Sequence, residues 1–189
     1  MISPELSTGI TLTLYALAST AGIGGLLARR PFWRRLGCVL ACTGFASQTF
    51  MLLMGFHRTL PDGLSLGAYL QMLAWFVVLC GMGVLAKFRQ ESALIFATPL
   101  GLMLFAVSAP YLAAVVQAPP SLTASFYALH IGALFLSLSL LALSFAAGAL
   151  FLLTDLRIKR KQHIKGFWQD MPGLSVLDRI NAMTTAAGF

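Results

Sequence analysis

Charged residues are scarce in this sequence. Only 10% of its 189 residues are Asp, Glu, Lys or Arg, whereas 58% are hydrophobic, and the mean hydropathy is +0.83. From Ser92 to Thr154 the chain contains no charged residue at all. A water-soluble domain needs more polar cover than this on its outer face. The composition therefore excludes an ordinary soluble domain and predicts a protein whose main solvent is membrane hydrocarbon.

Acidic residues and the common catalytic motifs are missing from the apolar runs. All six acidic residues lie in or beside the polar segments between these runs. A proton or cation relay of the transporter type needs a carboxylate inside a span, so such a transporter is not expected. The chain also has no glycine-rich phosphate loop, no HExxH motif and no GxSxG motif. We expect a binding or assembly protein rather than an enzyme.

Cysteine is rare as well, with three residues and no CxxC motif. Cys38 and Cys42 have the i, i+4 spacing that puts two side chains on one helix face. This spacing is open to two interpretations, a metal or redox pair and a packing face of small apolar side chains. The second is favoured, because nothing else in the sequence supports thiol chemistry.

The apolar runs predict five membrane-spanning helices. Each run is long enough to cross a hydrocarbon core of about 30 Å at about 1.5 Å of rise per residue. The first run is not preceded by basic residues, so we expect a retained helix rather than a cleavable signal peptide. The predicted fold class is an all-α, polytopic transmembrane helix bundle with spans at about 10–28, 36–56, 66–86, 92–115 and 125–153.

The basic residues predict the orientation of this bundle. If the N-terminus is outside, twelve of the thirteen Lys and Arg residues fall in loops on the inner side, and only Arg58 lies outside. The positive-inside rule therefore predicts an outer N-terminus and cytoplasmic basic loops. The net charge of +7 is clustered between apolar runs, so it indicates a membrane surface and not a nucleic acid as the partner.

The C-terminal part of the chain is more polar. Residues 154–179 are predicted to form a basic cytoplasmic segment that contacts anionic lipid headgroups, with Trp168 as an interfacial anchor. Residues 180–189 begin a mildly apolar stretch that is too short to span a membrane. Two interpretations are open: the start of a truncated sixth helix, and a short tail that packs against the other helices.

His130 is the only imidazole in the long uncharged run. It lies near the outer end of the fifth predicted span, roughly 7 Å deep by helical rise. Ser137, Ser144 and Gly148 follow it at helical spacing and form a row of small and polar residues. Such a row favours contact with other helices over contact with lipid, so we expect His130 to point into the bundle. A ligand role and a purely structural role are equally open for this histidine.

Two further polar residues are candidates for a site with His130. His57 ends the second predicted span on the outer side, and neutral imidazole nitrogen is a good ligand for heme iron. A solvated loop position is the simpler interpretation for His57. Gln48 lies nearer the middle of the same span, where a buried amide needs a hydrogen-bonding partner.

Several segments resemble the cytochrome c assembly family, which includes CcsA-type heme-delivery proteins and HemX-like and YpjD-like relatives. One is a helix that opens with Leu129-His-Ile, continues with small residues and ends at a basic loop. Another is Met171-Pro-Gly-Leu-Ser-Val-Leu-Asp178, which is similar to the turn that precedes the family's next helix. A Pro-Asp-Gly turn and a helix with Ala74-Trp75 also fit, so the resemblance covers about 46–189.

The resemblance implies a function in cytochrome c biogenesis in the bacterial cytoplasmic (inner) membrane. It implies that His130 binds the iron of heme b, and that heme is handled for or delivered to apocytochrome c with a partner membrane protein. The family's second ligand lies in a His-Thr context, which Gln48-Thr49 replaces here, so either His57 is the second ligand or this protein does not bind heme as the CcsA-type members do. HemX-like resemblance implies instead a regulatory or scaffold protein of tetrapyrrole synthesis that acts through 154–179.

Overall fold

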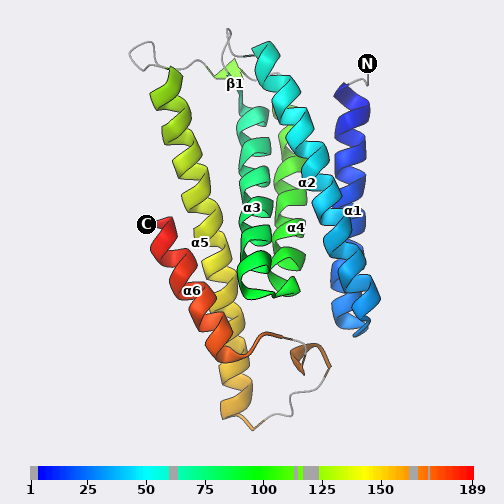
Figure 1. The fold of residues 1–189 in the computed structure, drawn as a ribbon, viewed down its shortest axis with the longest axis vertical. Helices are drawn as coiled ribbons and strands as arrows, with labels where there is room; N and C mark the ends of the chain where they lie inside the picture. The colour runs from blue at the N-terminus through cyan, green and yellow to red at the C-terminus, as the bar shows by residue number, and fades with distance from the viewer. Residues whose placement is uncertain (1–3, 60–63, 113–114, 117–123, 162–165, 170) are drawn as a thin grey trace.

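The computed structural model describes residues 4–59, 64–112, 115–116, 124–161, 166–169 and 171–189. It is an all-α bundle, as the sequence predicts, and five of its helices are long and apolar enough to cross a membrane (Figure 1). The α-helices of the described residues are α1 (Pro4–Leu27), α2 (Pro31–Thr59), α3 (Leu66–Phe88), α4 (Glu91–Ser108), α5 (Ala124–Lys159) and α6 (Leu174–Gly188).

The helices form three antiparallel pairs, α1–α2, α3–α4 and α5–α6, with α3 and α4 in the middle (Figure 1). At one end β1 (Leu64–Ser65) pairs antiparallel with β2 (Val115–Val116), and we call this the β end. The α1–α2 turn, the α3–α4 turn and the C-terminal end of α5 lie at the other end, which we call the basic end (Figure 1). Its basic residues are Arg29, Arg30, Arg34, Arg35, Lys87, Arg89, Arg157, Lys159, Arg160 and Lys161.

Helix ends differ from the predicted span ends because hydropathy marks the membrane boundary and not the last hydrogen-bonded turn. α5 continues to Lys159 instead of ending at 153, since cations are favourable near a helix C-terminus. α6 begins at Leu174, within the segment expected to be a polar surface stretch. Helix α4 ends at Ser108 and continues as a 3-10 turn, η1 (Ala109–Tyr111), where Pro110 lacks the N–H that an α-helix needs.

Small residues bring α1 and α2 into close backbone contact. A Cβ atom added at Gly37 would lie 2.6 Å from the backbone nitrogen of Gly22, and one added at Gly25 would lie 2.6 Å from the backbone nitrogen of Arg34. The row of α1 that faces α2 is therefore Ala18, Gly22 and Gly25. Hydrocarbon lipid gives no hydrophobic gain for helix association, so such close packing is what stabilises the pair.

One packing prediction from the sequence is only half right. The small-residue pairs Thr20/Gly24 and Ala21/Gly25 both have the spacing of a helix-packing motif. Gly25 does pack on α2, but a Cβ at Gly24 would meet nothing within 4 Å, and Thr20 is exposed and bonds a carbonyl of its own helix. The reason is geometric. Helices α1 and α2 cross at the row centred on Gly22, so Gly24 lies on the outward-facing side of α1.

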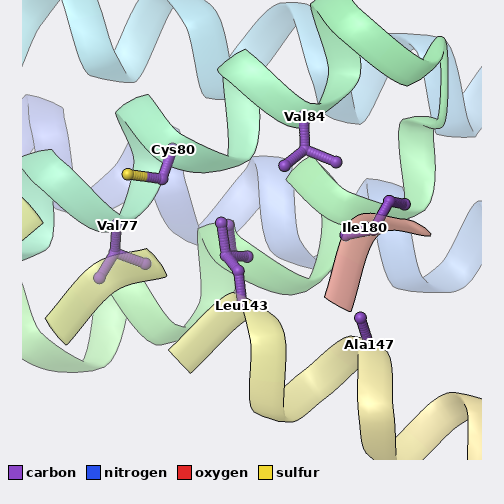
Figure 2. Close-up of a cluster of buried hydrophobic side chains, with 7 residues drawn as sticks. Val77, Cys80, Val84, Leu143, Ala147 and Ile180 are labelled. Atoms are coloured by element: carbon purple, nitrogen blue, oxygen red, sulfur yellow. The ribbon is translucent and has the colours of Figure 1, made fainter. Parts of the chain in front are cut away.

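A cluster of buried apolar side chains joins α3, α4, α5 and α6. Figure 2 shows Val77, Cys80 and Val84 of α3 lying across from Leu143 and Ala147 of α5, with Ile180 of α6 beside them. A second cluster around Tyr15, Ala41 and Val78 joins the first four helices. The two clusters share α3 and α4, which makes this pair the centre of the bundle.

Helix α6 packs along α5 and is held there by polar side chains. The Ser144 hydroxyl contacts the side chains of Asn181 and Thr185, and the Ser137 hydroxyl donates to the carbonyl of Gly188. The C-terminal stretch is thus helical and packs against a neighbour, which both interpretations of it allow. Such hydrogen bonds between helices contribute about 0.6–2 kcal/mol each in a membrane.

Candidate functional site

His130 lies near the first turns of α5, at the β end, and its side chain is exposed. The expectation that it points into the bundle is therefore wrong. The row beneath it was predicted correctly, because Ser137, Ser144 and Gly148 all contact α6. Helix α6 contacts α5 up to the level of Ser137, and His130 lies about two turns beyond that contact (Figure 1).

The first turns of α5, which carry His130, present large apolar side chains on their surface. Phe126, Leu129 and Leu134 are exposed on the same two turns. Tyr127 is half-buried, and its hydroxyl lies 2.9 Å from the hydroxyl of Tyr69 on α3. When two hydroxyls are hydrogen-bonded, one proton forms the bond between them and the other can be donated to a further acceptor. An imidazole, an apolar wall and a hydroxyl donor thus lie together at the β end.

Aromatic rings support this wall from the side of α3. The Phe135 ring of α5 lies 6.3 Å from the ring of Tyr69 and 6.3 Å from that of Phe76. Trp75 continues the series through its edge contact with Phe76. Sequence reasoning missed the two tyrosines, although tyrosine near the end of a span is typical of the membrane interface, and that signal could have found them.

Gln48 is not part of this site. Its side chain is fully buried, the Tyr15 hydroxyl donates to its Oε1 at 2.6 Å, and its Nε2 donates to the carbonyl of Gln71 at 2.8 Å. Both polar ends are therefore used in joining α1, α2 and α3, while His130 is on the exposed surface of α5. The interpretation of Gln48 as a cofactor-binding residue is replaced by a structural one.

The neighbouring residue Thr49 is also engaged within the bundle. Its hydroxyl accepts a hydrogen bond from Trp75 Nε1 at 2.7 Å and donates to the carbonyl of Phe45 at 2.8 Å. The Trp75 and Phe45 rings stack with their centroids 5.1 Å apart. The Gln48-Thr49 position is thus a polar connection between α2 and α3.

We expect Gln48→Leu to lower the free energy of unfolding by about 1–2 kcal/mol, because the fully buried Tyr15 hydroxyl loses its acceptor. Tyr15→Phe alone should cost about as much, since it leaves the amide oxygen without its donor. The double variant should lose less than the sum, which chemical unfolding in detergent measures as a coupling energy of about 1 kcal/mol. Thr13→Val is the control, because Thr13 is exposed and bonds only within α1; additive losses would contradict the pairing.

His57, the second imidazole candidate, falls in the last turns of α2, whose backbone reaches Thr59 at the β end. Its side chain lies outside the described residues. The backbone therefore places His57 and His130 at the same end of the bundle, on α2 and α5.

The cysteines form no site in the described part of the chain. All three are free, and Cys38 and Cys42 pack against the cluster around Tyr15, which agrees with the packing interpretation. Among the described residues no group of three or more His, Cys, Asp or Glu side chains is arranged to hold a metal ion. The candidate site at the β end therefore offers one imidazole, that of His130, beside the apolar side chains of α5.

No protein-family model, curated protein or solved structure matches this chain. The resemblance to the cytochrome c assembly family therefore rests on the sequence segments themselves, and what it implies about function is a proposal.

Proposed function

We propose that this protein is a heme-handling integral membrane protein of cytochrome c biogenesis, and that His130 binds the heme iron. The observation that carries the proposal is the exposed imidazole of His130 on the first turns of α5, among exposed apolar side chains. A polar side chain in an apolar run without charged residues, here 92–154, is costly at membrane depth, which favours a function for it.

The surroundings of His130 suit a porphyrin. A neutral imidazole nitrogen is a common axial ligand of heme iron. Phe126, Leu129 and Leu134 offer exposed apolar surface to the macrocycle. The Tyr69–Tyr127 pair offers a hydroxyl proton to an acceptor such as a propionate. Heme is the cargo in this proposal, and the protein's contribution is to bind and orient it.

The location follows from the positions of the basic residues. Since these gather at one end of the bundle, the positive-inside rule favours a cytoplasmic basic end and an outer β end. We propose a bacterial cytoplasmic membrane protein whose His130 lies near the outer surface. Apocytochrome c and a partner membrane protein of the assembly system would then meet it on that side.

The test is the visible absorption spectrum of the full chain purified in mild detergent, before and after heme is supplied. We expect a Soret band that stays with the protein through gel filtration. Micelles without protein are the control, because free heme partitions into detergent. A protein that shows no Soret band under either condition would refute heme binding.

A second candidate function is a regulatory scaffold of the HemX type, and the basic end favours it. Arg160 and Lys161 are exposed beyond α5, and the Arg157 guanidinium lies 4.4 Å from the centre of the Trp168 ring. A cytoplasmic protein with an acidic surface fits such a segment. Capture of an enzyme of tetrapyrrole synthesis by the full chain, together with the absence of a Soret band, would favour this function over the first.

A further inference from the structure

A small apolar crevice lies between α3, α4, α5 and α6 toward the basic end. Its wall includes Val84, Ala93, Phe96, Ala146, Leu150 and Pro172. Phe96, Ala146 and Leu150 are only half-buried, so the crevice is partly open on the side of α4 and α5. Both helices are long and apolar enough to cross a membrane, so in a bilayer this side would contact hydrocarbon.

The helices that lead to the basic end finish in an unusual way. Arg29 follows α1, Arg89 follows α3 and Lys161 follows α5, and all three have positive φ values, of 55°, 56° and 52°. They are the only non-glycine residues with positive φ in the described part of the chain. Glycine is preferred at such a position because a side chain is strained there. A basic residue at all three positions indicates that the positive charge at these helix ends has a function.

The helix dipole does not fully account for this choice. A cation favours a helix C-terminus from any position in the last turn, and Lys87 already occupies the last turn of α3 in a right-handed conformation. Arg89 is thus a second cation at the same helix end, in a strained conformation and exposed to the surroundings. A second exposed cation at this helix end is suited to attract an anion from outside the protein.

Lys87 and Arg89 lie close in the chain to two residues of the crevice wall. Val84, in its wall, is one helical turn before Lys87, and Ser92, also in its wall, follows Arg89 at the start of α4. Within the described ranges neither cation forms an ion pair. Glu91, the acidic residue nearest to them in the sequence, is held by Arg34 at 2.9 Å, and Asp155 on α5 is held by Lys159 at 2.7 Å. Asp178, on α6, is exposed.

We propose that this crevice and these two cations form a binding site for an anionic phospholipid, with an acyl chain in the crevice and the phosphate headgroup at Lys87 and Arg89. The apolar wall matches the chain and the unpaired cations match the headgroup. The opening on the side of α4 and α5 gives a lipid access from the bilayer. Most of the wall comes from α3, α4 and α5, so a lipid within the bilayer reaches it more directly than a soluble peptide or free anion does.

The test compares two headgroups on the same acyl chains. The full chain is placed in nanodiscs of phosphatidylcholine with a small fraction of phosphatidylglycerol or of labelled phosphatidylcholine, and lipid retained after detergent extraction is measured by native mass spectrometry. We expect wild type to retain phosphatidylglycerol preferentially, and each of Lys87→Gln and Arg89→Gly to lower this preference about fivefold. Equal retention of the two lipids by wild type would overturn the proposal.

The Arg89→Gly variant separates headgroup binding from folding. Glycine suits the left-handed conformation, so this variant should unfold in phosphatidylcholine at the same temperature as wild type or higher. Phosphatidylglycerol should raise the unfolding temperature of wild type and not that of Arg89→Gly. If it raises both equally, the cation does not bind the headgroup and the proposal fails.

The crevice itself is tested by filling it. Ala146→Phe should lower retention of phosphatidylglycerol, whereas Gly83→Phe, at an exposed position of α3 where a Cβ meets nothing within 4 Å, should not. Inorganic phosphate should not displace the lipid, because the chain supplies part of the binding. Displacement by phosphate would indicate that the site binds a free anion. Unchanged retention by Ala146→Phe would show that no acyl chain occupies the crevice. Either result would contradict the proposed lipid site.

Discussion

Gly37→Leu is expected to separate α1 from α2 and to lower the free energy of unfolding by about 3 kcal/mol or more. A Cβ at Gly37 would lie 2.6 Å from the nitrogen and 2.7 Å from the Cα of Gly22, and 3.0 Å from the carbonyl oxygen of Ala18. These are backbone atoms, so no side chain can move to relieve the clash, and the whole helix has to shift. Chemical or thermal unfolding in mild detergent measures the loss.

Gly24→Leu is the matched control for this prediction. Gly24 is exposed on the same helix pair, and a Cβ there would meet nothing within 4 Å. Both substitutions replace glycine inside a helix and gain helix propensity of up to about 1 kcal/mol, so the difference between them isolates the contact. Similar unfolding midpoints for the two variants would show that α1 and α2 do not cross at Gly22 and Gly37.

The fold could be predicted from the sequence to a large extent because it follows from composition. An uncharged run from Ser92 to Thr154 can be accommodated only by hydrocarbon, and backbone groups in hydrocarbon have to bond within helices. The five spans are therefore set by length and hydropathy, and the structure has them. The contact of Ser144 and Gly148 with another helix was also predictable, since small and polar residues favour helix contacts over lipid.

The candidate site could be predicted only in part because it depends on contacts between distant segments. The exposure of His130 depends on which distant segments pack against the first turns of α5, and no local pattern near His130 contains that information. The role of Gln48 depends in the same way on Tyr15, whose hydroxyl reaches it from another helix. The left-handed conformation of Arg89 was also hidden, because sequence patterns associate such positions with glycine.

His130→Ala is the second change with a large expected effect, since it removes the proposed iron ligand. The side chain is exposed, so its loss should leave the helical circular dichroism and the unfolding temperature unchanged. The Tyr69–Tyr127 hydrogen bond does not involve His130 and should also remain. We expect the Soret band to disappear while the protein stays folded, and free imidazole added to the variant should restore part of it.

Two other histidine variants serve as references. His163→Ala changes an imidazole that the sequence places in the basic segment, outside the described residues, and should leave the spectrum intact. His57→Ala tests the second ligand. If His57 binds the iron opposite His130, this variant should keep a Soret band but shift it toward a high-spin, five-coordinate spectrum.

The most direct test of the central claim is a heme titration of wild type, His130→Ala and His163→Ala in the same detergent, followed at the Soret band. We predict saturable binding with one heme per chain for wild type and His163→Ala, and no saturable binding for His130→Ala. If His130→Ala binds heme as tightly as wild type, with the same spectrum, His130 is not the ligand and the proposed heme site is wrong.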